Sequence, residues 1–176
     1  MSFELISPGY LKEQQHLHFD HPKKHKYGTG GPMWIEQIRD VIRSSHHVTV
    51  IDYGCGKGLL AKMLMVQCQS YDPAIPEFSK LPHPADLVVC LDVLEHIEPE
   101  FLDNVLDHLV SLAEKQLFVA VSLKEAGRVL RDGRNAHLIV KDPEWWTKQI
   151  VKRNCELVKI YPSRNFEFVA LFNSHG

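Results

Sequence analysis

Apolar residues along this chain gather in short runs that alternate with longer segments of helical periodicity. Three runs are rich in β-branched residues and end at turn residues, as buried strands do: residues 47–52 (HVTVID), 85–92 (ADLVVCLD) and 117–122 (LFVAVS). Residues 66–72 (VQCQSYD) favour a further, less apolar strand. Because ADLVVCLD is apolar nearly throughout, it fits a central strand of a parallel sheet that is covered on both faces.

Segments with apolar residues three and four positions apart predict helices between these strands. The expected helices cover about residues 33–44, 59–64, 99–115 and 142–153. Asp142 is placed to cap the last of them, and Pro143 suits its first turn. Residues 4–17 also have helical character, but we expect Pro8 and Gly9 to interrupt it.

The alternation of strands and helices predicts an α/β fold, a three-layer α/β/α sandwich with a mostly parallel sheet. The strand-like runs 156–161 and 166–172 are separated by PSRN, so we expect a C-terminal antiparallel hairpin to complete the sheet. A length of 176 residues favours one domain. Within it, we expect residues 1–45 to form an N-terminal lid and helical segment and residues 46–176 to form the core.

The composition excludes some classes of protein. With 20 basic and 22 acidic residues, the net charge of -2 argues against a dedicated nucleic-acid binder. Four cysteines without a Cys-x-x-Cys pair favour reduced thiols in a cytoplasmic protein. The first residues lack a signal-peptide pattern, and no apolar run approaches the roughly 18 residues of a membrane span. The oligomeric state is not determined by the sequence.

The segment IDYGCGKG, residues 51–58, places three alternate glycines between a predicted strand and a predicted helix. Such a turn lets the backbone approach a ligand, and the helix N-terminus favours an anionic group. A P-loop is excluded because a glycine follows Lys57, and the dinucleotide fingerprint fails because Leu59 replaces its last glycine. Asp72, 18 residues after Gly54, ends the next strand, where an acidic residue binds ribose hydroxyls.

Four segments together resemble class I S-adenosylmethionine-dependent methyltransferases. VTVIDYGCGKGLLAKML resembles their motif I, YDP the acidic end of their second strand, ADLVVCLDVLEHIEPEFLDNVLDHL their fourth-strand segment, and HLIVKDPEWWTKQI a late helix. The resemblance spans about residues 47–172 and implies a Rossmann-like fold with S-adenosyl-L-methionine as cofactor. In that family a helix and a third strand precede the fourth strand. Here only residues 73–84 are present, so we expect this edge strand and its helix to be missing or reduced.

Carried over residue by residue, the resemblance implies a cofactor site at the carboxyl ends of the strands. The expected cofactor-binding residues are Tyr27, Gly28, Asp52, Gly54, Cys55, Gly56, Lys57, Asp72, Pro73, Leu91, Asp92 and Val93. The glycine turn would hold the methionine end, Asp52 would brace the turn, and Asp72 would bind the ribose. Backbone groups and Ile75, Phe78 or Leu81 would contact the adenine.

Two histidine-containing patterns raise the question of a metal. HLHFDH, residues 16–21, has the spacing of dinuclear zinc hydrolases of the metallo-β-lactamase type, but no buried strand leads into it. Asp92-x-x-Glu95-His96 with His137 resembles the metal-binding set of small-RNA 2′-O-methyltransferases, whose first member is Glu. We assign no metal ligand on this basis. Instead we expect His96, Glu95 and His137 to be the catalytic groups, one of which serves as base when the acceptor carries a proton.

The resemblance thus implies an S-adenosylmethionine-dependent methyltransferase that acts on an unidentified small-molecule acceptor, under a lid built from residues 1–32 and 123–141. One alternative is a metal-assisted nucleic-acid methyltransferase of the RNA 2′-O type. It would bind phosphates through HPKKHK (21–26) and through three arginines on one face, Arg128, Arg131 and Arg134. The other alternative is a catalytically silent protein that binds the cofactor or a partner.

Overall fold

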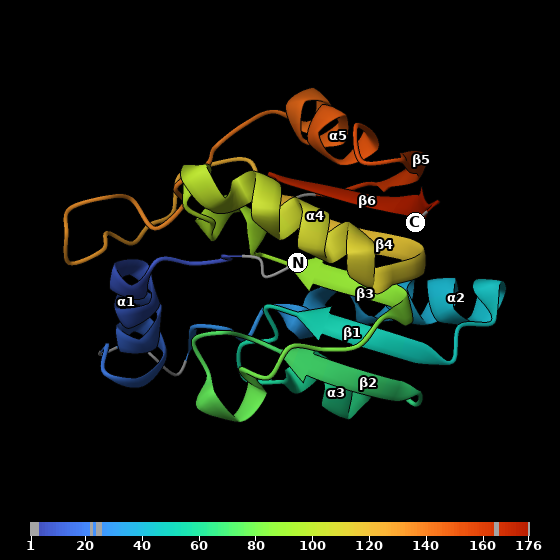
Figure 1. Cartoon of the computed structure of the whole chain (residues 1–176), viewed down its shortest axis with the longest axis horizontal. Coiled ribbons are helices and arrows are strands. Elements are labelled where there is room, and N and C mark those ends of the chain that lie inside the picture. The colour runs from blue at the N-terminus through green and yellow to red at the C-terminus, as the bar shows by residue number, and fades with distance from the viewer. Residues whose placement is uncertain (1–3, 22, 24–25, 164–165, 176) are drawn as a thin grey trace.

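A computed structural model describes residues 4–21, 23, 26–163 and 166–175 of the chain (Figure 1). Six strands form one sheet in the order β2-β1-β3-β4-β6-β5. The strands are β1 (Thr49–Tyr53), β2 (Gln67–Tyr71), β3 (Ala85–Leu91), β4 (Ala113–Ser122), β5 (Cys155–Tyr161) and β6 (Glu167–Ser174). Neighbours among β1 to β4 pair in parallel, whereas β6 runs antiparallel to both β4 and β5. The predicted mostly parallel sheet with a C-terminal antiparallel hairpin is confirmed.

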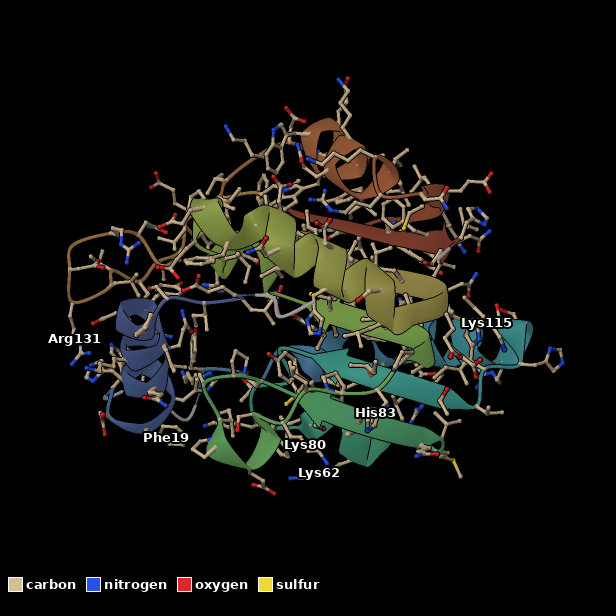
Figure 2. All side chains as sticks on the ribbon, in the orientation of Figure 1. Phe19, Lys62, Lys80, His83, Lys115 and Arg131 are labelled. Atoms are coloured by element: carbon tan, nitrogen blue, oxygen red, sulfur yellow. The ribbon has the colours of Figure 1, made fainter. Side chains whose placement is uncertain are left out.

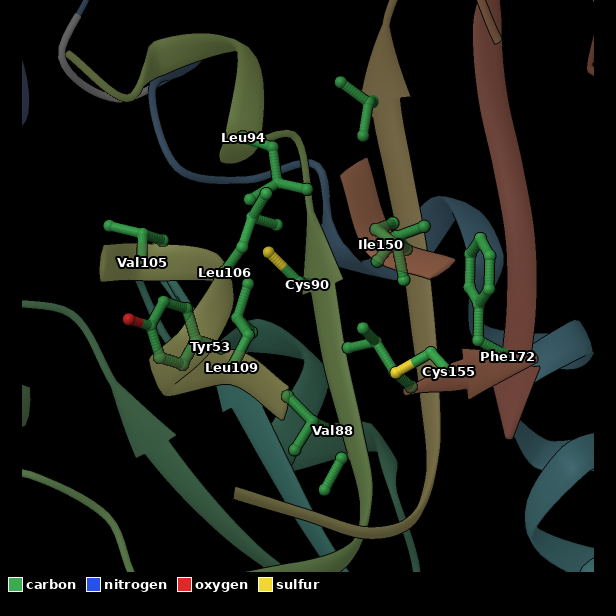
Figure 3. Packing of buried hydrophobic residues seen from close by; sticks show 14 of the residues in the cluster. Tyr53, Val88, Cys90, Leu94, Val105, Leu106, Leu109, Ile150, Cys155 and Phe172 are labelled. Atoms are coloured by element: carbon green, nitrogen blue, oxygen red, sulfur yellow. The ribbon is translucent and has the colours of Figure 1, made fainter. Parts of the chain in front are cut away.

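Helices cover both faces of this sheet, which confirms the three layers. The helices α2 (Ile35–Ser45) and α3 (Leu59–Met63) contribute to one apolar cluster, and α4 (Leu102–Leu112) and α5 (Pro143–Val151) contribute to the other. Along β1, β4 and β6, alternate side chains enter opposite clusters. In β1, for example, Val50 packs toward α2, and Ile51 packs toward α4. Figure 3 shows the cluster between the sheet and the helices α4 and α5, in which Cys90 of β3 faces Leu106 of α4.

The sheet ends at β2, where the family of the sequence resemblance has a further strand. Between β2 and β3, residues 73–84 form a single 3₁₀ turn, Pro76–Phe78, and otherwise an irregular connection. Four prolines in these twelve residues remove backbone donors that a strand or helix needs. The expected loss of the edge strand and its helix is confirmed in this described segment.

Two predicted boundaries were wrong. Pro8 does not interrupt a helix but begins α1 (Pro8–Phe19), since Ser7 caps it by accepting a bond from the Tyr10 amide at 3.1 Å. The helix expected to reach residue 115 ends at Leu112, and β4 starts at Ala113. Pairing of this residue with β3 outweighs the local helical preference there.

α1 and the segment 123–141 lie together beyond the carboxyl ends of β1, β2 and β3 (Figure 1). They share a small apolar cluster built on Tyr10, Leu17, Leu130 and Ala136. On its outer side, the Arg131 guanidinium pairs with the Glu13 carboxylate at 2.9 Å, and Figure 2 shows Arg131 beside α1. No helix in the described part of the chain is long and apolar enough to cross a membrane.

Candidate functional site

A cavity of about 1060 Å³ lies between the carboxyl ends of the parallel strands and the cover formed by α1 and residues 123–141. Its lining contains fourteen of the fifteen residues predicted for the site: Tyr27, Gly28, Asp52, Gly54, Cys55, Gly56, Asp72, Pro73, Leu91, Asp92, Val93, Glu95, His96 and His137. The exception is Lys57, which is not part of this lining. Its backbone N–H donates to the Gly28 carbonyl at 3.1 Å, so it ties the N-terminal segment to the glycine turn.

The glycine turn is held in a conformation that side chains would block. Gly54 and Gly56 have φ values of +72° and +51°, in the left-handed region that favours glycine. A Cβ on Gly54 would lie 2.3 Å from a methyl carbon of Val93, and one on Gly56 would lie 2.6 Å from the Gly28 Cα. The turn therefore packs directly against the tip of β3 on one side and against the N-terminal segment on the other.

Asp72 lies at the end of β2 with its carboxylate directed at the glycine turn. Oδ2 accepts the Gly56 N–H at 3.0 Å, and Oδ1 accepts the Ala74 N–H at 2.9 Å. His18 of α1 approaches the same carboxylate, with Nε2 4.0 Å from Oδ2. Burial raises the pKa of Asp72, opposed by His18 and the two amides, and burial lowers the pKa of His18. Each carboxylate oxygen keeps lone-pair capacity for a ligand hydroxyl.

Two further acidic groups line the cavity floor. Burial, followed by the charge of Asp72, raises the pKa of Asp52 to about 7. Burial, followed by the charge of Glu167, raises the pKa of Asp92 to about 6. Asp92 has a φ of +54°, which an aspartate tolerates better than most residues, and its N–H donates to the Ala120 carbonyl at 2.9 Å. This backbone conformation presents the residues after β3 to the cavity.

Glu95, His96 and His137 form a further group in the cavity lining. The first two belong to a 3₁₀ turn, Leu94–His96, and the third comes from the covering segment. One potential ligand atom of each residue lies within 4.8 Å of the others, and the two imidazole rings are 4.8 Å apart between centroids. The predicted catalytic residues are thus brought together although His137 lies 41 positions after His96 in the chain.

The environment of this group disfavours charge. Burial, followed by the charge of Asp92, raises the pKa of Glu95 to about 8. Burial, followed by His137, lowers the pKa of His96 to about 4. His96 Nδ1 lies 2.7 Å from the Ala136 carbonyl and His137 Nδ1 lies 2.6 Å from the Lys124 carbonyl, so both Nδ1 atoms carry the proton. The Nε2 atoms of both rings are therefore left as acceptors.

α1 supplies cavity residues that sequence reasoning missed. The Tyr10 hydroxyl donates to the His96 carbonyl at 2.6 Å, and the Tyr27 hydroxyl donates to Gln14 Oε1 at 2.6 Å. Together with His18, which approaches Asp72, these side chains join the cover to the turn Leu94–His96 and to the end of β2. No motif marks Tyr10 or Gln14, and HLHFDH did not indicate the contact of His18 with Asp72, because the face that α1 turns inward depends on how it docks.

Three expectations about other residues need correction or restriction. Ile75, Phe78 and Leu81, proposed to contact the adenine, do not line the cavity, whereas Ala74 does. HLHFDH forms no group of potential metal ligands in the described chain, where Glu95, His96 and His137 form such a group. Within HPKKHK, residues 22, 24 and 25 lie outside the described residues.

The three arginines considered for phosphate binding do not form one free basic face. Arg131 pairs with Glu13, and Arg134 pairs with Asp132 at 2.7 Å. Arg128 stacks over the Tyr27 ring, 4.8 Å from its centroid. Two of the three guanidinium groups therefore already have carboxylate partners, which weakens the nucleic-acid alternative.

Comparison with known proteins gives consistent matches. The profile of the family described as "Methyltransferase domain" matches residues 34–169. Magnesium protoporphyrin IX methyltransferase of Arabidopsis thaliana chloroplasts is 32% identical over 109 residues, which are 47% of this chain and 35% of that protein. The chain thus matches about a third of that relative's length.

Two solved structures share the fold. The magnesium protoporphyrin IX methyltransferase of Synechocystis PCC 6803, with bound S-adenosylhomocysteine, superposes with a TM-score of 0.60 at 15% identity and covers 94% of both chains. The 1,6-didemethyltoxoflavin-N1-methyltransferase of Burkholderia thailandensis, with its acceptor and S-adenosylhomocysteine, superposes with a TM-score of 0.71 at 11% identity. That match covers all of this chain and 94% of the other.

Proposed function

Because this chain belongs to the methyltransferase domain family, and with it to the class I S-adenosylmethionine-dependent methyltransferases, we propose that it methylates a small-molecule acceptor. One observation carries the proposal: the glycine turn, Asp72 and the group Glu95, His96 and His137 converge on a single covered cavity. One covered space thus offers both a backbone-lined turn with a buried carboxylate that suits the cofactor and a group of side chains that suits an acceptor.

The residues of the cavity fit the cofactor. Gly54 and Gly56 leave no room for a side chain, so the turn presents only backbone atoms there. This suits a close approach by the methionine end of the cofactor. The buried Asp72 carboxylate, oriented by two amides, suits the ribose hydroxyls. The tip of β3, Leu91 to Val93, lines the same cavity, and Val93 packs against Gly54 of the turn. When bound, S-adenosylmethionine supplies a methyl group that is already activated on a sulfonium sulfur.

The protein's own contribution is alignment and exclusion of water. α1 and residues 123–141 form the lid, and α2 belongs to the core because it packs on the sheet. This lid holds the acceptor against Glu95, His96 and His137, one of which takes up the acceptor's proton when the acceptor carries one. A cavity of about 1060 Å³ is at the upper end of the range for one drug-sized ligand, so it accommodates a cofactor with a small acceptor.

The experiment combines cofactor binding with turnover. Asp72→Ala should abolish measurable binding of S-adenosylhomocysteine, whereas Asp40→Ala, an exposed change on α2 that removes its pairing with Arg43, should leave it unchanged. Incubation with S-adenosylmethionine and a panel of small hydroxyl- and amine-bearing acceptors should then release S-adenosylhomocysteine. Unchanged binding in Asp72→Ala contradicts the assigned site, and binding without turnover on any acceptor favours a silent protein.

Salt dependence separates the nucleic-acid alternative. We expect RNA to bind weakly, because Arg131 and Arg134 are already paired. Tight RNA binding that falls steeply with added salt would favour an RNA substrate instead. The four cysteines are free thiols, three of them buried, which supports placing the reaction in the reducing cytoplasm.

A further inference from the structure

We propose that Glu95, His96 and His137 together bind one divalent transition-metal cation, to which an oxygen of the acceptor coordinates. The cation site itself is independent of the function proposed above. Its part in catalysis rests on that function. The sequence led us to expect no metal ligand, and the arrangement of three side-chain atoms in the folded chain changes that expectation.

The potential ligand atoms of the three residues lie close together. All three lie within 4.8 Å of one another. For any triangle with sides no longer than this, a point exists at most 4.8/√3, about 2.8 Å, from every corner. Bonds from zinc to imidazole nitrogen and carboxylate oxygen are about 2.0 to 2.2 Å. Side-chain rotations that move each ligand atom by less than about 1 Å therefore bring all three atoms to bonding distance from one ion.

Each of the three residues also has one potential ligand atom committed to a protein hydrogen bond and one left free. Both Nδ1–H groups donate to backbone carbonyls, of Ala136 and Lys124, which leaves both Nε2 lone pairs available. Glu95 Oε1 accepts the Ser122 N–H at 2.9 Å. Glu95 Oε2 is buried without a hydrogen-bond partner among the described residues, and the side chain is fully inaccessible to solvent. A buried carboxylate oxygen without a partner is costly, and a cation removes that cost.

Hydrogen bonds to the protein hold both histidines in place. Metal-binding histidines commonly donate their second N–H to a backbone carbonyl, which fixes the ring and its tautomer. His137 is further held by Asn135, whose side-chain oxygen accepts the N–H groups of His137 and Ala126 at 2.9 and 3.0 Å. The Asn135 amide donates back to the Ala126 carbonyl at 2.9 Å. The long covering segment is thereby organised around the residue that completes the site.

The donor set narrows the choice of ion. Two imidazole nitrogens and one carboxylate suit Mn²⁺, Fe²⁺, Co²⁺ or Zn²⁺ better than Mg²⁺ or Ca²⁺, which prefer all-oxygen ligands. Three protein ligands on one side leave coordination positions open toward the cavity. An ion there would lower the pKa of an acceptor hydroxyl in an open position, and the proton would pass to water while the acceptor binds, before the lid excludes water. The acceptor oxygen then forms the new bond to the methyl carbon, and the electron pair of the sulfur–methyl bond returns to sulfur.

Calorimetry on the chelator-treated full chain tests the site with MnCl₂ and ZnCl₂ as probes. We expect one ion per chain, and affinity reduced at least tenfold in Glu95→Gln and His137→Ala. His16→Ala is the control, because it disrupts HLHFDH and leaves the proposed site intact, so its affinity should match the wild type. Absence of binding, or equal affinity in all variants, overturns the proposal. Loss confined to His16→Ala also overturns it.

A parallel titration with S-adenosylhomocysteine separates this inference from the proposed function. It reports whether each variant is folded, since the cofactor side is built from other residues. Cofactor binding without metal binding overturns the cation site and leaves the methyltransferase with a proton-accepting catalytic group. Metal binding without cofactor binding supports the cation site and contradicts the proposed function.

Discussion

The contact between the glycine turn and the N-terminal segment yields a sharp prediction for Gly56→Ala. Alanine at a φ of +51° costs about 1 to 2 kcal/mol relative to glycine. Its Cβ would lie 2.6 Å from both Cα and O of Gly28. These are backbone atoms, so no rotamer change relieves the collision, and residues 27–30 must move away. That movement breaks the bond from the Lys57 N–H to the Gly28 carbonyl, worth about 1 kcal/mol.

The total cost is about 2 to 3 kcal/mol of unfolding free energy. For a chain of this length each kcal/mol corresponds to about 2 to 4 °C, so the melting temperature should fall by about 4 to 12 °C. Because the displaced segment carries Tyr27 and Gly28 into the cavity lining, affinity for S-adenosylhomocysteine should fall at least tenfold. Denaturant unfolding and calorimetry at a temperature where the variant is folded measure the two effects separately.

Two other glycines serve as matched controls. Gly133 has a φ of +90°, and a Cβ added there would meet nothing within 4 Å, so Gly133→Ala tests backbone strain without collision. Gly127→Ala has neither strain nor collision and should change stability by less than about 0.5 kcal/mol. We expect Gly133→Ala to lose stability and keep cofactor affinity. If Gly56→Ala behaves like Gly133→Ala in both assays, the backbone contact does not hold the lid, and the reasoning is refuted.

Three further predictions concern the core, the pH response and the lid. Trp146→Ala should cost about 3 to 5 kcal/mol in denaturant unfolding, because this side chain is fully buried, and half-buried Trp145→Ala should cost less than half as much. Asp86 pairs with Lys115 and accepts two backbone N–H groups at the start of β1, so its pKa is held below the ordinary value. Asp86→Asn should therefore destabilise the protein above about pH 4, and the stability difference from the wild type should shrink as the pH falls below about 4. A stability difference that stays constant with pH would contradict the assignment. Arg131→Ala breaks an exposed ion pair with Glu13 and should change the unfolding free energy by less than about 1 kcal/mol. In stopped-flow experiments, S-adenosylhomocysteine should nevertheless dissociate up to about fivefold faster. An unchanged dissociation rate would show that this ion pair does not hold the lid closed.

The parts of the fold that depend on local chemistry were predictable from the sequence. The segment IDYGCGKG has its apolar strand, glycines and helix start within a few residues, and the family, fold class and cofactor that it indicates are confirmed. Asp72 was found because an acidic residue at the end of the next strand must lie beside that turn. The missing edge strand was also predictable, because the proline-rich connection 73–84 is a local feature of the sequence.

The missed features depend on contacts between distant segments. α1 is polar on several faces, so nothing in its sequence shows that Tyr10 and His18 turn toward the cavity. The start of β4 at Ala113 is decided by pairing with β3. The proximity of His96 and His137 came from the family resemblance, since the sequence spacing alone cannot bring a covering loop onto a turn. Roles of the individual site residues stay predictions until a ligand is bound.

A crystal structure of the protein with S-adenosylhomocysteine tests the central claim most directly. We predict that the ribose hydroxyls bind the Asp72 carboxylate, that the methionine end lies along Gly54 to Gly56, and that the sulfur faces Glu95, His96 and His137 across the cavity. A ligand bound elsewhere, or one whose sulfur points away from these three residues, would contradict the account of the site.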